Sequence, residues 1–129
     1  MPLVRITQQD VRTPEQSRRL ADLVQEVMRE HFAAPPGDRY QILETLPVGA
    51  IIAEDTGLGI ERSEGVVIIQ ITQQGRSQEQ KQAIFAALAE RLAQEDLVRP
   101  EDLVISIVGN QREDWSFGHG RAQFLTGEL

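Results

Sequence analysis

The chain has 129 residues, of which 40% are apolar and 5% aromatic, which is typical of one globular domain with a mostly aliphatic core. Its 13 basic and 20 acidic residues give a net charge of −7 without a basic run, which argues against nucleic-acid binding and against attraction to anionic lipid. The sequence contains no cysteine, which excludes disulfides and thiolate metal sites. With no signal-like start and no apolar run long enough to cross a bilayer, we expect a soluble cytoplasmic domain.

The first half of the chain predicts a strand, a helix and a second strand. Residues 3–6 form a short strand directly after Pro2. The helix begins at Thr13, whose hydroxyl can form a capping box with Gln16. An apolar stripe at helical spacing predicts that one side of this helix lies on a sheet: Leu20, Leu23, Val24, Val27, Met28 and Phe32. The returning strand covers residues 40–43.

The second half predicts the same order of elements after a linker at residues 47–65. Ile51 and Ile52 in this linker suggest a short strand. Residues 66–71 are apolar almost throughout, which indicates a strand covered on both faces. A second capping box begins the next helix at Ser77, and its apolar stripe consists of Ile84, Phe85, Leu88 and Leu92. The last strand covers residues 103–108, and the tail after it holds three of the six aromatic residues.

Three pairs of segments recur in one order and indicate an internal duplication. Residues 6–9 and 71–74 both read ITQQ, an offset of 65. Residues 13–16 (TPEQ) match 77–80 (SQEQ), and residues 36–38 (PGD) match 100–102 (PED), both at an offset of 64. We therefore expect one α+β domain over residues 1–129, with β-α-β units at about 2–46 and 66–108 and a tail at 109–129. Right-handed crossovers make the two strands of each unit parallel and place both helices on one face of the sheet. The other face is left uncovered, and we expect oligomerisation to bury it.

A proline at position 2 that opens a duplicated β-α-β unit resembles the arrangement of the tautomerase superfamily. Within it, the chain is similar to the malonate semialdehyde decarboxylase family. The supporting segments are residues 38–42 (DRYQI), 54–60 (EDTGLGI), 114–118 (DWSFG) and 120–127 (GRAQFLTG). The resemblance runs nearly end to end and implies a homotrimer with three equivalent sites, a small carboxylate as substrate, and neither a metal nor an organic cofactor.

Pro2 is the first candidate catalytic residue. Removal of Met1 would leave a secondary amine, and an α-amino group titrates at about 7.7–8.0. The neutral amine can act as a base or form an iminium ion, whereas the cationic amine can polarise a carbonyl as an acid. Proline is also an ordinary first residue of an edge strand. The repeat and the resemblance together favour the catalytic interpretation.

Arg76, Gln74 and Asp38 are the polar candidates. Arg76 directly precedes the Ser77 cap, where a guanidinium can bind a carboxylate bidentately. The resemblance matches Arg76 to the second of two arginines of the family. The first is missing from this sequence, which reads QQGR at residues 73–76, and Gln74 can donate only a neutral hydrogen bond there. Asp38 matches an acidic residue that can assist Pro2 or orient water. Asp102 occupies the equivalent point of the second unit, so Asp38 could equally be a turn-shaping residue.

The resemblance also implies an apolar wall around the proline, formed by Trp115, Phe117, Phe124 and Leu129. Apolar surroundings favour loss of uncharged carbon dioxide from a bound carboxylate, and they depress the pKa of an ammonium group. The same side chains could instead form the core of a trimer. His31 and His119 have no third ligand in prospect, so neither indicates a metal site.

The leading hypothesis is decarboxylation of a small β-keto acid, malonate semialdehyde or a near analogue. Arg76 with Gln74 would hold the carboxylate, and Pro2 would polarise the carbonyl as an acid or capture it as an iminium ion. The alternative enzyme is a keto–enol tautomerase of a 2-oxo acid, or a hydratase of an acetylenic acid, with neutral Pro2 as the base. A third hypothesis is a trimeric binding module without catalysis, which the fold alone would permit.

Overall fold

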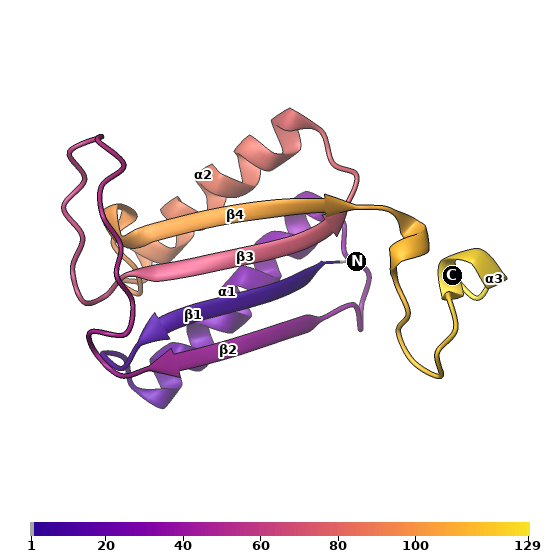
Figure 1. Cartoon of the computed structure of the whole chain (residues 1–129), viewed down its shortest axis with the longest axis horizontal. Coiled ribbons are helices and arrows are strands. Elements are labelled where there is room, and N and C mark those ends of the chain that lie inside the picture. Colours follow the sequence, from indigo (N-terminus) through magenta and orange to yellow (C-terminus); the bar gives the residue numbers. More distant parts are fainter. Residues whose placement is uncertain (1) are drawn as a thin grey trace.

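A four-stranded mixed sheet in the order β2-β1-β3-β4 organises the chain (Figure 1). The computed structural model describes residues 2–129. Strands β1 and β2 are parallel, β3 and β4 are parallel, and the two inner strands β1 and β3 are antiparallel. The two long helices lie together on one face of this sheet. The α+β fold with two β-α-β units is thereby confirmed.

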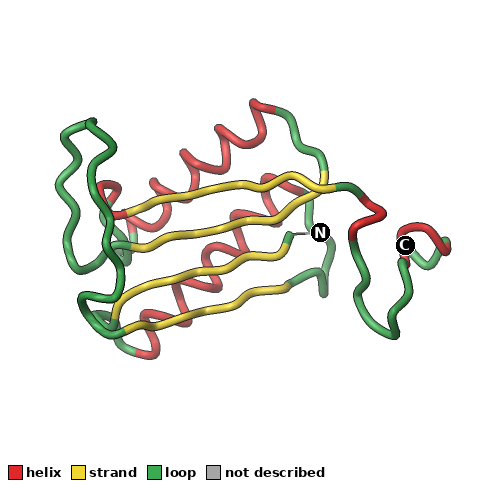
Figure 2. Tube along the Cα trace, in the orientation of Figure 1, coloured by secondary structure: helices red, strands yellow, loops and turns green. Residues whose placement is uncertain are grey.

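The elements follow the predicted order, and the strands run somewhat longer than predicted. The main elements are β1 (Leu3–Gln9), α1 (Pro14–Phe32), β2 (Tyr40–Leu46), β3 (Val67–Gln74), α2 (Gln78–Gln94) and β4 (Leu103–Asn110). Three short helices complete the chain: η1 (Pro100–Asp102), η2 (Arg112–Asp114) and α3 (Gln123–Thr126). The linker between β2 and β3 lies beyond one end of the sheet, and the tail after β4 lies beyond the other (Figure 2).

The predicted strand at Ile51 and Ile52 is wrong. Every residue from 47 to 66 is described, and none of them lies in a strand. The backbone N–H groups of Gly49 and Ile51 donate to the side-chain oxygen of the buried Gln9, at 2.7 and 3.2 Å. Because a side chain takes these donors, the segment follows a loop path, and Ile52 is left 88% exposed.

Both predicted helix starts are confirmed. Thr13 forms a capping box with Gln16, and Ser77 forms one with Gln80. The apolar stripe of α1 is buried throughout, but that of α2 is wrong at Phe85, which is 38% exposed. Residues four apart share a side of a helix, so the buried set of α2 is Ile84, Leu88 and Leu92.

The core lies between the helices and the inner strands. Val4 and Ile6 of β1 are buried against the helices, and their neighbours Leu3 and Arg5 point to the opposite face and are exposed. Within residues 2–129 that opposite face carries neither long helix, so apolar side chains such as Ile42 are partly open on it. No helix among the described residues is long and apolar enough to cross a membrane.

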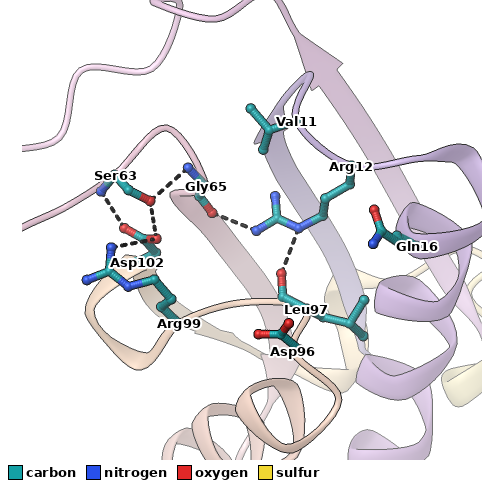
Figure 3. Close-up of a pocket in the computed structure, with 9 residues that line it drawn as sticks. All are labelled: Val11, Arg12, Gln16, Ser63, Gly65, Asp96, Leu97, Arg99 and Asp102. Carbon is teal, nitrogen blue, oxygen red and sulfur yellow. Dashed lines mark hydrogen bonds and ion pairs between the residues drawn. The ribbon is translucent and has the colours of Figure 1, made fainter.

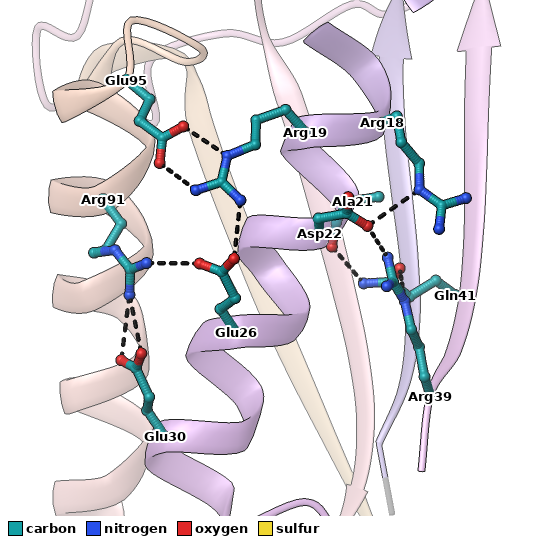
Figure 4. Close-up of polar contacts among 10 residues, drawn as sticks. All are labelled: Arg18, Arg19, Ala21, Asp22, Glu26, Glu30, Arg39, Gln41, Arg91 and Glu95. Carbon is teal, nitrogen blue, oxygen red and sulfur yellow. Dashed lines mark hydrogen bonds and ion pairs between the residues drawn. The ribbon is translucent and has the colours of Figure 1, made fainter. Parts of the chain in front are cut away.

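Charged side chains align the two helices along their exposed seam (Figure 4). Arg19 of α1 donates to both carboxylate oxygens of Glu95, at 2.7 and 2.6 Å, and also to Glu26. Arg91 of α2 reaches back to Glu26 at 2.8 Å and to Glu30. Each pair is partly solvated and contributes little alone, but the shared partners join the pairs into one network that fixes the pairing of α1 with α2.

Candidate active site

One end of the sheet collects the polar residues that the sequence singled out. Leu3, which follows Pro2, pairs with Tyr40 at the start of β2 and with Thr72 near the end of β3. Gln74 ends β3 and pairs with the last residue of β4, after which the tail begins. The amino terminus, the entry to β2, the end of β3 and the tail therefore meet at the same end (Figure 1).

Pro2 is buried and lies immediately before β1. Because β1 is an inner strand, its first residue is flanked by the ends of two neighbouring strands and does not lie at the sheet edge. The removal of Met1, on which a free Pro2 amine depends, concerns a residue outside the described range.

Helix α1 fixes the approach to β2 and with it the position of Asp38. The side-chain amide of the buried Gln25 donates to the Asp38 carbonyl at 3.2 Å. Next to it, Arg39 donates to Asp22 of α1 at 2.8 Å (Figure 4). The Asp38 residue is only 4% exposed, and burial raises the pKa of its carboxyl, while the positive charge of the amino terminus acts in the opposite direction.

Asp38 and Asp102 have different surroundings, although the repeat makes them equivalent. The Asp102 carboxylate accepts from the backbone N–H of Ser63 at 2.7 Å and from its hydroxyl at 2.5 Å, so it fixes the linker. The Asp38 carboxyl instead lies in the field of the amino terminus. The structure thus shows a linker-fixing role for Asp102, and a role of Asp38 beside Pro2 stays a prediction.

Replacing Asp38 with asparagine is expected to trade function for stability. A raised pKa means that the ionised carboxyl costs folding free energy: its contribution is fully favourable below the unfolded value, about 3.9, and is lost as the pH rises through the folded value. We expect Asp38→Asn to have a Tm at pH 7 equal to or above that of the unchanged protein, with lower turnover. The difference in Tm should vanish near pH 3, and a lower Tm for the variant at pH 7 would contradict this account.

Arg76 is anchored between the end of β3 and the end of α1. Its guanidinium donates to the carbonyls of Gln74 and Gly75, at 3.1 and 2.8 Å, and to that of Phe32 at 3.2 Å. It also lies over the Phe32 ring, 5.1 Å from the centroid. These three acceptors are neutral backbone carbonyls, and they fix the orientation of the guanidinium. The buried Gln73 donates to the side-chain oxygen of Gln74 at 3.3 Å and orients that amide beside Arg76.

The tail folds its rings into one cluster at the same end. Phe117 is central: it stacks on Trp115 at 5.5 Å between centroids, meets Phe124 edge-on at 5.6 Å and stacks on Tyr40 at 5.6 Å. Three of the four predicted wall residues thus lie together. Leu129 is 55% exposed and lies outside the ring contacts.

Two polar side chains hold the tail in this shape. The indole N–H of Trp115 donates to the Asn110 side chain at 3.0 Å, which ties the ring to the end of β4. The buried Gln123 accepts from the Phe117 backbone N–H and donates to the Gly118 carbonyl, both at 2.9 Å. The aromatic cluster is therefore built on the sheet by specific hydrogen bonds as well as by ring contacts.

Tyr40 is the residue that the sequence analysis missed. It lies two residues after Asp38 in one of the recognised segments, but nothing local in the sequence indicates that the tail, 77 residues later, stacks on it. Tyr40 is the first residue of β2, so this contact joins the ring cluster to the sheet.

Tyr40→Ala is therefore expected to raise KM for an anionic substrate about threefold to tenfold, because the lost stacking contributes about 0.5–1.5 kcal/mol beyond simple burial. Tyr40→Phe keeps the ring and should stay within twofold of the unchanged protein. Steady-state kinetics of both variants checks the expectation. An equal loss in the two would show that the hydroxyl matters and not the stacking.

The described residues contain no group of three or more His, Cys, Asp or Glu side chains that could hold a metal ion. The same end of the sheet holds Pro2, whose nitrogen is a secondary amine only once Met1 is removed, together with a carboxyl of raised pKa, a guanidinium and a set of rings. Such groups can move protons, polarise a carbonyl and bind a carboxylate.

This fold and this arrangement are those of the tautomerases, and the chain belongs to the tautomerase family. Two family models, both described as tautomerase enzyme, match residues 38–118 and residues 2–60. The chain is thus an enzyme of the tautomerase superfamily.

Its relatives narrow the class. The chain is 43% identical, over the full length of both proteins, to the probable tautomerase YrdN of Bacillus subtilis (strain 168). It is 47% identical to a malonate semialdehyde decarboxylase (FG41) whose structure was solved with the inhibitor 3-bromopropiolate; the TM-score is 0.93, covering 98% of this chain and 97% of that one. A second malonate semialdehyde decarboxylase, with decarboxylase and hydratase activities, is 38% identical with a TM-score of 0.92 over 98% of each chain. The resemblance noted from the sequence is confirmed.

Proposed function

We propose that this enzyme decarboxylates a small β-keto acid, with malonate semialdehyde or a near analogue as substrate. The observation that carries the proposal is the meeting of Pro2, Asp38 and Arg76 at one end of the sheet beside the aromatic cluster. The similarity to two malonate semialdehyde decarboxylases supports the choice of substrate.

In the proposed reaction Arg76, with Gln74, binds the carboxylate and holds its breaking carbon–carbon bond out of the plane of the carbonyl. The Pro2 amine polarises that carbonyl as a cationic acid, or replaces its oxygen to form an iminium ion with release of water. When the bond breaks, its electron pair moves into the carbonyl or iminium group, which gives an enol or an enamine, and carbon dioxide leaves. Protonation of the carbon, and hydrolysis of the iminium where one has formed, yield the aldehyde.

Asp38 and the rings have supporting roles in this scheme. The raised pKa of Asp38 suits a group that passes a proton to or from Pro2 or water. Trp115, Phe117 and Phe124 give the carboxylate an apolar surrounding that its charge disfavours and that neutral carbon dioxide tolerates. Leu129 was predicted beside them, and we keep it as a candidate that closes the site in an assembled particle.

The direct test is to incubate purified protein with malonate semialdehyde and to follow acetaldehyde and carbon dioxide. Borohydride added during turnover separates the two forms of the mechanism: a reduced adduct on Pro2 supports the iminium, and turnover without an adduct supports the acid. The absence of measurable acetaldehyde at micromolar enzyme would overturn the decarboxylase proposal.

A tautomerase acting on a 2-oxo acid is the second candidate, and two observations favour it. One of the two arginines that the resemblance implies is missing from residues 73–76 (QQGR), where Gln74 offers only a neutral amide, and the relative YrdN, matched over its full length, is a probable tautomerase. In this case neutral Pro2 removes the proton next to the carbonyl as a base. The same amine could direct hydration of an acetylenic acid. Phenylpyruvate is the substrate for assaying this activity. If neither malonate semialdehyde nor phenylpyruvate reacts and Met1 is retained, the remaining hypothesis is a binding module without catalysis.

We also propose that the working particle is a homotrimer. The sheet face opposite the helices carries the partly exposed apolar side chains of Leu3, Tyr40 and Ile42. A second copy is the economical cover for such a face. Sedimentation equilibrium should give three 14.5-kDa chains per particle, and a monomer at micromolar concentration would rule the trimer out.

A further inference from the structure

A second cluster of charged side chains lies at the opposite end of the sheet. A cavity of about 220 Å³ opens there, lined by residues that include Arg12, Asp102 and Arg99 (Figure 3). Arg12 follows β1, and Asp102 precedes β4. The proposed reaction uses none of these side chains, yet Arg12 and Asp102 both form hydrogen bonds with the linker.

The repeat relates this cluster to the candidate active site. Arg12 directly precedes the Thr13 cap of α1, as Arg76 directly precedes the Ser77 cap of α2. Asp102 and Asp38 each stand two residues after a proline and lead into the second strand of their unit, and they are 1% and 4% exposed. Arg12 and Asp102 therefore each have a buried or half-buried counterpart in the other unit, namely Arg76 and Asp38.

The sheet places the two clusters at opposite ends. Its inner strands β1 and β3 run antiparallel, so the two β-α-β units are related by a two-fold rotation perpendicular to the sheet. Such a rotation moves a residue at the end of one inner strand to the opposite end of the sheet. Arg12 with Asp102 is thus the rotated equivalent of Arg76 with Asp38.

The two ends differ in what lies before the inner strand. Strand β1 begins two residues after the start of the chain, whereas β3 is preceded by the linker. The Gly65 carbonyl of this linker accepts from Arg12 Nη2 at 2.7 Å, so the linker occupies a donor of this guanidinium. Arg12 Nε donates to the Leu97 carbonyl at 2.8 Å (Figure 3). Its Nη1 donates to the side-chain oxygen of Gln8 at 3.2 Å.

The linker is packed closely against both charged groups. Asp102 accepts two hydrogen bonds from Ser63, and a Cβ on Gly65 would come within 3.3 Å of the Asp102 carboxylate. Burial lowers the pKa of Arg12, and the negative charge of Asp102 opposes this shift. Linker residues thus form hydrogen bonds with both Arg12 and Asp102.

We propose that the Arg12–Asp102 cluster clamps the linker to the sheet and binds no carboxylate, although it is the rotated equivalent of Arg76 with Asp38. The proposal rests on the proposed function for the contrast with Arg76. Arg12 stabilises the fold by joining two segments distant in sequence, at Gly65 and Leu97, and neither contact involves the end of the sheet where Arg76 reaches the Phe32 carbonyl. The duplicated arginines have divided a structural role and a binding role between them.

Matched substitutions test this division. We expect Arg12→Gln to lower Tm by about 5 °C or more and to leave kcat/KM within twofold at a temperature where the variant is folded. Arg76→Gln should lower Tm by less than half as much and reduce kcat/KM strongly. An unchanged Tm in Arg12→Gln, or a loss of kcat/KM equal to that of Arg76→Gln, would overturn the clamp.

Malonate provides a readout that does not depend on turnover. Calorimetric titration of the unchanged protein should give one malonate per chain, lost in Arg76→Gln and kept in Arg12→Gln. Two malonates per chain would show that the second cluster still binds ligand. If Arg12→Gln does not fold, Asp102→Asn replaces it in the same comparison. If the protein has no turnover, the proposed function fails, while the Tm comparison still decides the clamp.

Discussion

Replacing Pro2 with alanine is expected to lower kcat by about 10²- to 10⁴-fold, the range that a positioned acid or base contributes. Alanine retains an amine once Met1 is removed, but this amine is primary and its direction is no longer fixed by a ring. The aldehyde product from malonate semialdehyde, or the enol from phenylpyruvate, measures the loss. The effect should fall on kcat more than on KM, because Arg76 still binds the carboxylate.

Pro14→Ala is the matched control for Pro2→Ala. Pro14 is exposed at the first turn of α1, where its missing N–H costs nothing and alanine is tolerated. We expect its kcat within twofold of the unchanged protein and a similar Tm for both variants. Mass spectrometry of the amino terminus must accompany the assay, since a retained Met1 would block the amine in any variant. If Pro2→Ala lacks Met1 and still turns over within threefold, the reaction does not depend on the proline ring or its secondary amine.

The pH dependence distinguishes the two states of the amine. An amine that acts as a base must be neutral, so kcat/KM rises with pH through its pKa; one that acts as an acid must be protonated, so kcat/KM falls through the same pKa. The free group titrates at about 7.7–8.0, and the apolar rings near the site oppose its protonation. A rising limb would favour the tautomerase and a falling limb the acid-assisted decarboxylase.

Local signals were enough to predict most of the fold. Thr13 and Ser77 each satisfy backbone donors within their own helix, so a four-residue pattern determines where α1 and α2 begin. The failures came from partners distant in sequence. Ile51 has an apolar neighbour as a strand would, but its N–H is taken by Gln9, 42 residues away, and no local pattern records that bond.

The candidate site shows the same division. Pro2 and Arg76 could be selected as candidates from the repeat and the resemblance, because each lies next to a strand or helix that the sequence predicts. The different surroundings of Asp38 and Asp102 could not be predicted from the sequence. They depend on Ser63, which donates to Asp102 across 39 residues. Tyr40 was not predicted because its partner is also distant in sequence. Its ring stacks on Phe117, which lies in a tail held in place by Gln123.

Replacing Arg76 with glutamine is expected to lower kcat/KM about 10²-fold for an anionic substrate. A bidentate contact gives the carboxylate two charge-assisted hydrogen bonds, and their loss costs about 3 kcal/mol after water competes for the same groups. Arg76→Lys keeps the charge without the planar pair of donors, so an intermediate loss of about tenfold is expected. Arg18→Gln on the exposed surface of α1 changes the net charge equally and should leave kcat/KM within twofold.

Gln74→Arg tests the same site in the opposite direction. A second guanidinium beside Arg76 should lower KM for malonate semialdehyde severalfold, because it adds a positive charge where the amide of Gln74 donates only a neutral hydrogen bond. The gain should disappear for the uncharged analogue propanal measured as a competitive ligand, which separates charge recognition from packing. Since Arg76 is held by three backbone carbonyls, it stays in place when its neighbour changes. A loss of kcat/KM in Arg76→Gln no larger than in Arg18→Gln would mean that the substrate carboxylate is bound elsewhere.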